Sequence, residues 1–131
     1  MAKKRRSAAV RALPARRIEC RFLVPMVRDS DRRPHAPRHW MAFDDAMRAL
    51  FDGWQGPEGP VPGNYKNRSG RWVTDRCRRY TVALPRERVP ALRDFLRQVA
   101  NTFDQECIYF VVGFDVELVD AEPSAGYLGD G

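Results

Sequence analysis

The stretch from Arg86 to Val119 constrains the fold more than any other part of the chain. Apolar residues recur there at intervals of three and four, at Val89, Leu92, Leu96, Val99 and Phe103. This spacing predicts an amphipathic helix. After three polar residues comes the continuous apolar run Cys107–Val112. A short run that is apolar on both faces indicates a strand inside a sheet.

The upstream sequence supplies the elements that could cover this unit. Residues 18–27 alternate between apolar and other side chains, which predicts a half-buried strand. An apolar stripe predicts a helix over 39–54, and a turn at 67–70 joins a short strand at 64–66 to a longer one ending at 84. The order strand, helix, hairpin, helix, strand resembles the ferredoxin-like superfold over roughly residues 18–119. It implies an α+β domain of βαββαβ order, an antiparallel sheet with two helices on one face.

The 131 residues are enough for one ordinary domain. We expect a basic disordered arm at 1–17, a single α+β domain at 18–120 and a frayed C-terminal tail at 121–131. The glycine- and proline-rich segment Gln55–Gly63 is the strongest breaker cluster and predicts a turning, non-strand connection. Gly113 predicts a bend within the last strand, after which the alternation resumes.

Side-chain parity predicts two unlike faces for this sheet. One face gathers the apolar positions of the strands and is expected to meet both helices. The opposite face is mixed, with Glu19, Arg21, Leu23, Arg79, Thr81, Ala83, Tyr109 and Val111. A partly apolar face of this kind needs a cover, which a second subunit, the proline-rich segment or a ligand could provide. The leading hypothesis is a homodimer through this face.

Charge is unevenly distributed along the chain. The net charge is +6, yet residues 1–40 hold 12 Lys/Arg against 3 Asp/Glu, whereas residues 41–131 hold 11 against 14. A basic arm on a near-neutral domain favours nucleic acid or another polyanion as a partner. The candidate contacts are Lys3, Lys4, Arg5, Arg6, Arg21, Arg79 and Tyr109. Alternatively, the 20 Arg against 3 Lys reflect genome composition, and the charge is incidental.

The sequence holds no recognisable catalytic motif. His35 and His39 have a spacing compatible with a metal pair, but Pro37 lies between them, and we expect no metal and no cofactor. Cysteines 20, 77 and 107 are widely spaced, which indicates reduced thiols and a cytoplasmic protein. No apolar stretch approaches the ~20 residues of a membrane span.

One aromatic cluster, Tyr65 and Trp72 with Arg71, is a candidate ligand-binding site on the hairpin. The leading functional hypothesis is nevertheless a small non-enzymatic binding or accessory module that contacts nucleic acid through its basic arm. The first alternative is a protein–protein interaction domain that dimerises through the sheet face. The second is a small enzyme of unknown class that uses the segment Gln55–Arg71.

Overall fold

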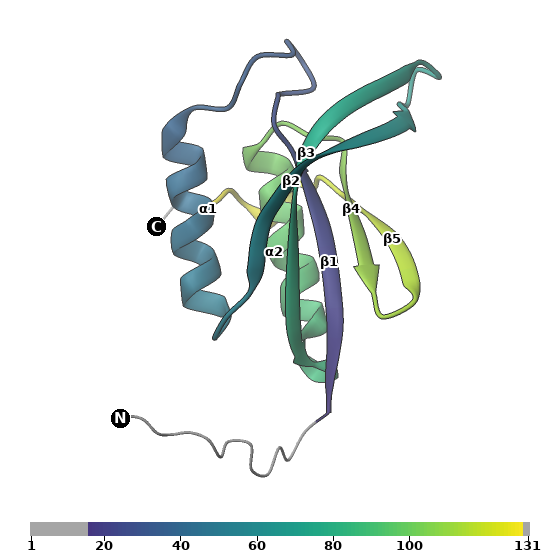
Figure 1. Ribbon diagram of the computed structural model, residues 1–131. Coiled ribbons are helices and arrows are strands. Elements are labelled where there is room, and N and C mark those ends of the chain that lie inside the picture. The colour runs from purple at the N-terminus through teal and green to yellow at the C-terminus, as the bar shows by residue number, and fades with distance from the viewer. Residues whose placement is uncertain (1–15, 130–131) are drawn as a thin grey trace.

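A computed structural model describes residues 16–129 of the chain. Five strands and two α-helices make up this part: β1 Arg17–Pro25, α1 Pro37–Leu50, β2 Gln55–Lys66, β3 Trp72–Pro85, α2 Val89–Thr102, β4 Cys107–Val112 and β5 Asp115–Asp120. The strands form one sheet in the order β2-β3-β1-β4-β5, and every neighbouring pair is antiparallel (Figure 1). The structure therefore confirms an α+β fold with an antiparallel sheet.

The element order differs from the predicted βαββαβ at the C-terminal end. Gly113 lies in a turn rather than a bend, with φ of 60° in the left-handed region that glycine tolerates. The chain reverses there, and β5 pairs antiparallel with β4, with Val111 opposite Val116. The alternation after Gly113 was predicted as a continuation of the same strand, because periodicity alone cannot tell a bend from a tight hairpin turn.

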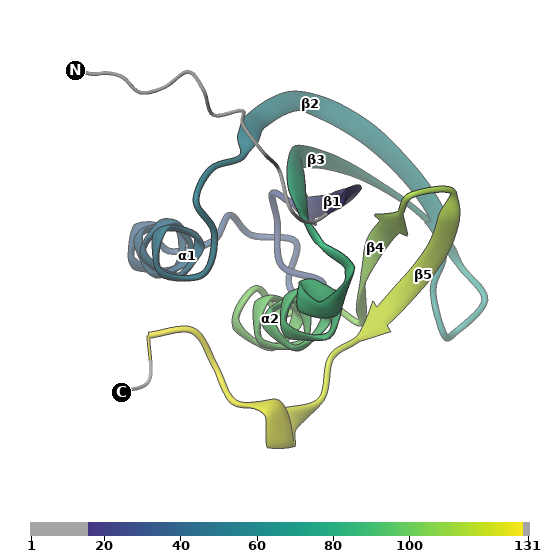
Figure 2. The same cartoon turned by 90° about the horizontal axis from the view of Figure 1, so that it is seen from below.

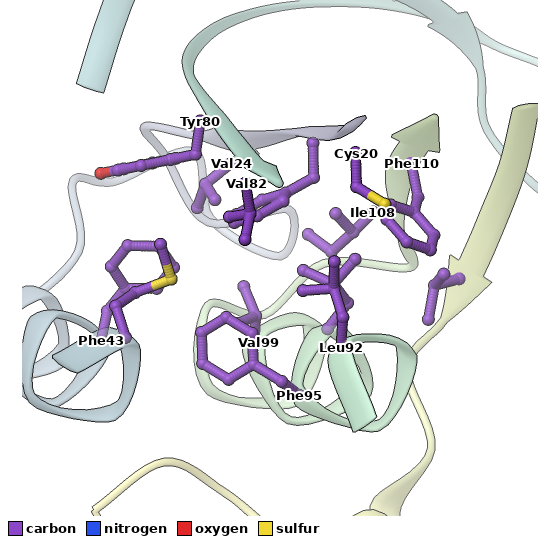
Figure 3. Packing of buried hydrophobic residues seen from close by; sticks show 14 of the residues in the cluster. Cys20, Val24, Phe43, Tyr80, Val82, Leu92, Phe95, Val99, Ile108 and Phe110 are labelled. Carbon is purple, nitrogen blue, oxygen red and sulfur yellow. The ribbon is translucent and has the colours of Figure 1, made fainter. Parts of the chain in front are cut away.

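The core lies between the sheet and the two helices, which cover the same face (Figure 2). Phe22 of β1 stacks on Tyr80 of β3, with ring centroids 5.4 Å apart, and its edge meets Phe95 of α2 at 6.4 Å. Figure 3 shows the strand residues facing Phe43 of α1 and the apolar stripe of α2. Complete burial of a side chain of this size stabilises a protein by about 1.5–3 kcal/mol. The inward parity predicted for β1, β3 and β4 is the parity that the structure buries.

Strand β2 corrects the interpretation of the glycine- and proline-rich segment. Residues 55–63 continue into 64–66 as one 12-residue strand at the edge of the sheet, with two irregularities in its pairing to β3. Prolines are tolerated at an edge, where no ladder hydrogen bond is needed from their nitrogen. Gly56 and Gly59 have φ of 118° and 119°, and a Cβ on either would lie within 3 Å of a β3 carbonyl. The glycines therefore permit a close approach to β3.

The C-terminal segment packs against α2 instead of fraying over the part that the structure describes. Leu128 is buried in the core, and its N–H donates to Oγ1 of Thr102 at 2.8 Å. Asn101 donates from Nδ2 to the carbonyls of Glu122 and Gly126. Most of the predicted basic arm, residues 1–15, lies outside the described residues. None of the described helices has the length or apolar character needed to cross a membrane.

Candidate functional site

A pocket of about 530 Å³ opens on the outer face of the sheet, away from the helices. The distal half of the β2–β3 hairpin bends toward β4 and β5 and forms one of its walls (Figure 1). The volume falls in the range of small-molecule sites. We call it the outer-face pocket; it is lined by Leu23, Pro25, residues 63–68, Asp75, Cys77, residues 105–107, Tyr109, Leu118 and Asp120.

Asp75 of β3 is the most deeply buried charged side chain in this lining, with an exposed fraction of 1%. Its Oδ1 accepts a hydrogen bond from Nη2 of Arg32 at 2.5 Å. Its Oδ2 is equally buried but has no hydrogen-bond partner among residues 16–129. A buried carboxylate oxygen without a donor is costly, and such atoms in native proteins call for an explanation. Asp75 lines the outer-face pocket, although Oδ2 itself has almost no accessible surface.

Asp29 does not line the outer-face pocket itself, but Tyr65 and Glu106, which do, both donate hydrogen bonds to its carboxylate. Tyr65 donates from its hydroxyl to Oδ1 of Asp29 at 3.0 Å, and the N–H of Glu106 donates to Oδ2 at 2.9 Å. Burial raises the pKa of Asp29, although both hydrogen bonds act in the opposite direction. Burial and the neighbouring Asp29 carboxylate raise the pKa of Tyr65 as well. Tyr65 therefore keeps its proton at neutral pH and serves as a fixed donor.

The hairpin tip closes one end of the pocket against β5. The N–H of Arg68 donates to Oε1 of Glu106 at 3.3 Å, and its guanidinium lies 3.8 Å from Oδ1 of Asp120. Both side chains of the Arg68–Asp120 pair are about two-thirds exposed, so this ion pair is weak. The contact marks the end at which a ligand could enter.

Apolar and aromatic groups form the floor of the outer-face pocket. Leu23 comes from β1, and Tyr109 of β4 lies directly opposite Leu118 of β5. Tyr109 and Leu118 are both largely exposed, so they offer a flat apolar surface on which an aromatic ring could stack. Cys77 also lines the pocket, and burial raises its pKa to about 11. It is a neutral thiol at physiological pH rather than a thiolate nucleophile.

The structure describes three of the residues that were predicted to contact nucleic acid, Arg21, Arg79 and Tyr109. Arg79 is paired with Glu58, its Nε lying 3.1 Å from Oε1, so its charge is neutralised locally. Arg21 is exposed on β1, and neither arginine lines the outer-face pocket that holds Tyr109. Residues 3–6 lie outside the described residues. Arg79 lies opposite Leu23 of β1 and Arg21 opposite Val111 of β4, so both arginines share a face of the sheet with Tyr109. A contact of these residues with nucleic acid stays a prediction.

The predicted ligand-binding cluster is brought together, on the other side of the hairpin. Tyr65, Arg71 and Trp72 line a second hollow of about 540 Å³, which Asp29 and Arg32 also line. Trp72 is exposed, and Nζ of Lys66 lies 5.4 Å from its ring centroid. Tyr65 reaches both hollows. A binding role for these three residues stays a prediction.

The acidic residues of the outer-face pocket were missed by sequence reasoning. Asp29 and Glu106 are 77 positions apart, and no motif links them with Asp75 or Asp120. The sequence feature that could have indicated the pocket was Asp75, an acidic residue inside a predicted strand. Among residues 16–129 no group of three or more His, Cys, Asp and Glu is arranged to hold a metal ion. His35 is instead buried against Phe103, with ring centroids 4.7 Å apart.

Comparisons with known proteins identify a fold but no family. No family model matches the chain, and no curated protein matches its sequence. A solved structure, a phage SAM lyase in complex with S-methyl-5'-thioadenosine, is similar in fold with a TM-score of 0.60 and 19% identity. The match covers 84% of this chain and 94% of that chain. At this identity the likeness shows a shared fold.

This finding contradicts the predicted non-enzymatic module. The structural neighbour is an enzyme, and its match extends over most of both chains. We therefore withdraw the hypotheses of a non-enzymatic binding module and of a pure interaction domain, while contact with nucleic acid and dimerisation stay predictions.

Proposed function

We propose that this chain is a small lyase that binds S-adenosylmethionine in the outer-face pocket and releases S-methyl-5'-thioadenosine. The fold likeness to a SAM lyase supports the reaction class. The pocket supports the ligand class, because it combines a flat aromatic floor with carboxylates on its walls. S-adenosylmethionine has matching parts, an adenine ring, a sulfonium and an ammonium group. The enzyme alternative named the segment Gln55–Arg71. Residues 63–69 and Arg71 of that segment line the outer-face pocket and the second hollow.

The observation that carries the proposal is the unpartnered Oδ2 atom of Asp75. An acceptor that is buried without a donor favours a ligand with N–H groups and positive charge. Arg32 already donates to Oδ1 of this carboxylate, so Oδ2 is the oxygen without a donor. In this arrangement Asp75 binds the amino-acid part of the substrate, while Tyr109 and Leu118 support the adenine ring.

The proposed reaction needs no proton at the leaving group. The bond between the sulfonium sulfur and the γ-carbon of the amino-acid chain breaks, and its electron pair goes to sulfur, which leaves as a neutral thioether. The γ-carbon gains a new bond to an oxygen of the substrate's own carboxylate, which closes a five-membered lactone. Atoms and electrons balance without a second reactant. The protein's task is then to fold the substrate so that this oxygen lies behind the carbon.

Opposite charges disappear during this step, and this determines which surroundings help. The substrate carboxylate and the sulfonium become neutral together, so apolar surroundings destabilise the separated charges more than the transition state. The floor formed by Leu23, Tyr109 and Leu118 supplies such surroundings. Asp75 would assist best at the ammonium group, whose charge does not change during the reaction, rather than at sulfur.

The purified full chain tests the proposal directly. Incubation with S-adenosylmethionine should release S-methyl-5'-thioadenosine and homoserine lactone in equal amounts, measured by liquid chromatography and mass spectrometry. D75N should lower kcat/KM by about 100-fold. D45N is the matched control, since it makes the same change at an exposed carboxylate on α1. A wild-type chain that neither binds nor cleaves S-adenosylmethionine would refute the proposed function.

For the fold we propose a finer description, a ferredoxin-like arrangement extended by β5. The order β2-β3-β1-β4 in the sheet supports it, since β1 lies between β3 and β4 and each helix connects strands that are not neighbours. In this description the β4–β5 hairpin is an addition that widens the outer face and contributes Leu118 and Asp120 to the pocket.

A further inference from the structure

Arg32 contacts Asp75 but does not itself line the outer-face pocket. Its Nη2 donates to Oδ1 of Asp75 and lies 3.3 Å from the carbonyl oxygen of Thr74. Its Nη1 is 3.8 Å from Oδ1 of Asp29. The side chain lines the second hollow, beyond the hairpin, and is not part of the lining of the outer-face pocket. Arg32 can therefore influence a ligand in that pocket only through other residues.

The backbone at Arg32 is held in an unfavourable conformation. Its φ is 60°, in the left-handed region where glycine and asparagine are far commoner than arginine. The N–H of Arg32 donates to the carbonyl of Arg28 at 3.0 Å, and Arg28 donates from its own N–H to the carbonyl of Arg33 at 2.8 Å. These two hydrogen bonds hold the loop in the conformation from which the Arg32 side chain reaches Asp75.

We infer that Arg32 is a positioning residue that holds Asp75 so that Oδ2 faces an ammonium group in the outer-face pocket. This inference rests on the proposed function, because it names the part of the substrate that Asp75 binds. A sulfonium has no N–H to donate, whereas an ammonium group has three, so the open acceptor selects the ammonium end. By donating to Oδ1, the guanidinium holds the carboxylate and leaves Oδ2 as the oxygen without a donor.

Two non-reactive ligands separate this role from general support of the structure. S-adenosylhomocysteine carries the ammonium group, whereas S-methyl-5'-thioadenosine has the same nucleoside but no amino-acid part. The R32G variant removes the side chain and suits a φ of 60°. By calorimetry, R32G should weaken S-adenosylhomocysteine binding about tenfold or more and change S-methyl-5'-thioadenosine binding by less than about twofold. R33Q, at the adjacent exposed arginine, should leave both affinities unchanged.

A double-mutant cycle and a charge-conserving variant complete the experiment. In the D75N background, R32G should have no additional effect on S-adenosylhomocysteine, because both changes remove the same interaction. R32K keeps the positive charge but lacks the planar guanidinium, so it should lose part of the preference for S-adenosylhomocysteine over S-methyl-5'-thioadenosine. R32K also provides the test if R32G does not fold. Equal loss for both ligands, or no loss for either, would overturn the inference alone. A wild-type chain that binds neither ligand would overturn the proposed function and this inference together.

Discussion

Tyr65 of β2 donates a hydrogen bond from its hydroxyl to Oδ1 of Asp29, at 3.0 Å, across 36 positions of sequence. This bond joins the β2–β3 hairpin to the loop after β1. It also supports a carboxylate that burial already makes harder to ionise, as the raised pKa of Asp29 shows. The pair therefore contributes both to the pocket wall and to the dependence of stability on pH.

Removal of this hydroxyl should destabilise the protein in a pH-dependent way. In Y65F, Asp29 loses a donor that favours its ionised form, so its pKa should rise further. The native pKa of Asp29 lies above the usual 3.8, so ionisation of Asp29 is less favourable in the folded than in the unfolded chain. Asp29 therefore lowers the stability of the fold as the pH rises from 3.8 through the native pKa. We expect Y65F to be less stable than wild type by about 1 kcal/mol at pH 7 and by less at pH 4. Urea denaturation at both pH values measures the difference. A deficit that does not vary with pH would show that Asp29 is not involved.

His35 should make the fold sensitive to mild acid. Its Nε2 lies 2.8 Å from the carbonyl oxygen of Pro25, while Nδ1 is buried without a partner among the described residues. Burial lowers the pKa of His35, the Pro25 carbonyl opposes this, and His39 and Arg28 add repulsion. Since the native pKa lies below the usual 6.5, stability is greatest above pH 6.5 and falls as the pH drops below it toward the native pKa.

The H35Q variant tests this assignment. Glutamine can donate to the Pro25 carbonyl but does not titrate, so the stability of H35Q should decline less steeply between pH 6.5 and 5. At pH 7.5 we expect H35Q to be less stable than wild type. H39Q, at a less buried ring, should retain most of the wild-type decline. Guanidinium denaturation over this pH range measures both slopes. An H35Q variant that declines as steeply as wild type would assign the acid sensitivity to other groups.

Local periodicity was sufficient to predict much of the fold. The alternation around Phe22 and the helical stripe through Leu92 and Leu96 are properties of neighbouring residues, and the structure buries these side chains completely. Residues 64–66 of β2 were predicted as a strand, but residues 55–63 were missed because glycines and prolines usually break strands, and their use at a sheet edge depends on β3. Gly113 was misinterpreted because a bend and a hairpin turn leave the same alternation in the sequence.

The candidate site could not be predicted from the sequence, because its geometry is entirely tertiary. Asp75 resembles any polar residue in an alternating strand, and its significance comes from burial and from Arg32. Asp29 lies in a polar loop where carboxylates are common, and it gains a role only when Tyr65 and Glu106 meet it. The parity of the outer face did predict that Leu23 and Tyr109 need a cover, and both line the pocket.

Gly56 and Gly59 of β2 should be intolerant of any side chain. A Cβ at Gly56 would lie 2.5 Å from the carbonyl oxygen of Arg79, and the φ of 118° is unfavourable for alanine. We expect G56A to lose about 2 kcal/mol or more, because edge strand β2 must move away from β3. G53A is the matched control, as nothing lies within 4 Å of its Cβ position, and it should change stability by less than about 0.5 kcal/mol. Thermal unfolding of both variants makes the comparison, and equal melting temperatures would contradict it.

The outer face of the β4–β5 hairpin should mediate self-association. Phe114 is fully exposed in the turn, and Val116 and Leu118 are more than half exposed on the same hairpin. A contiguous apolar surface of this kind on a small domain favours burial against another protein. The homodimer expected from side-chain parity therefore stays a prediction, now with defined contact residues.

Light scattering during size-exclusion chromatography, at tens of micromolar protein, measures this association. Wild type should elute with the mass of a dimer, and V116K should move the equilibrium toward monomer, because a buried lysine without a partner is costly at an apolar interface. M41K is the control, since Met41 is equally exposed but lies on α1, across the molecule from this face. Leu118 is left unchanged in both variants because it also lines the outer-face pocket. A wild-type monomer, or equal dissociation of V116K and M41K, would exclude this face as the contact.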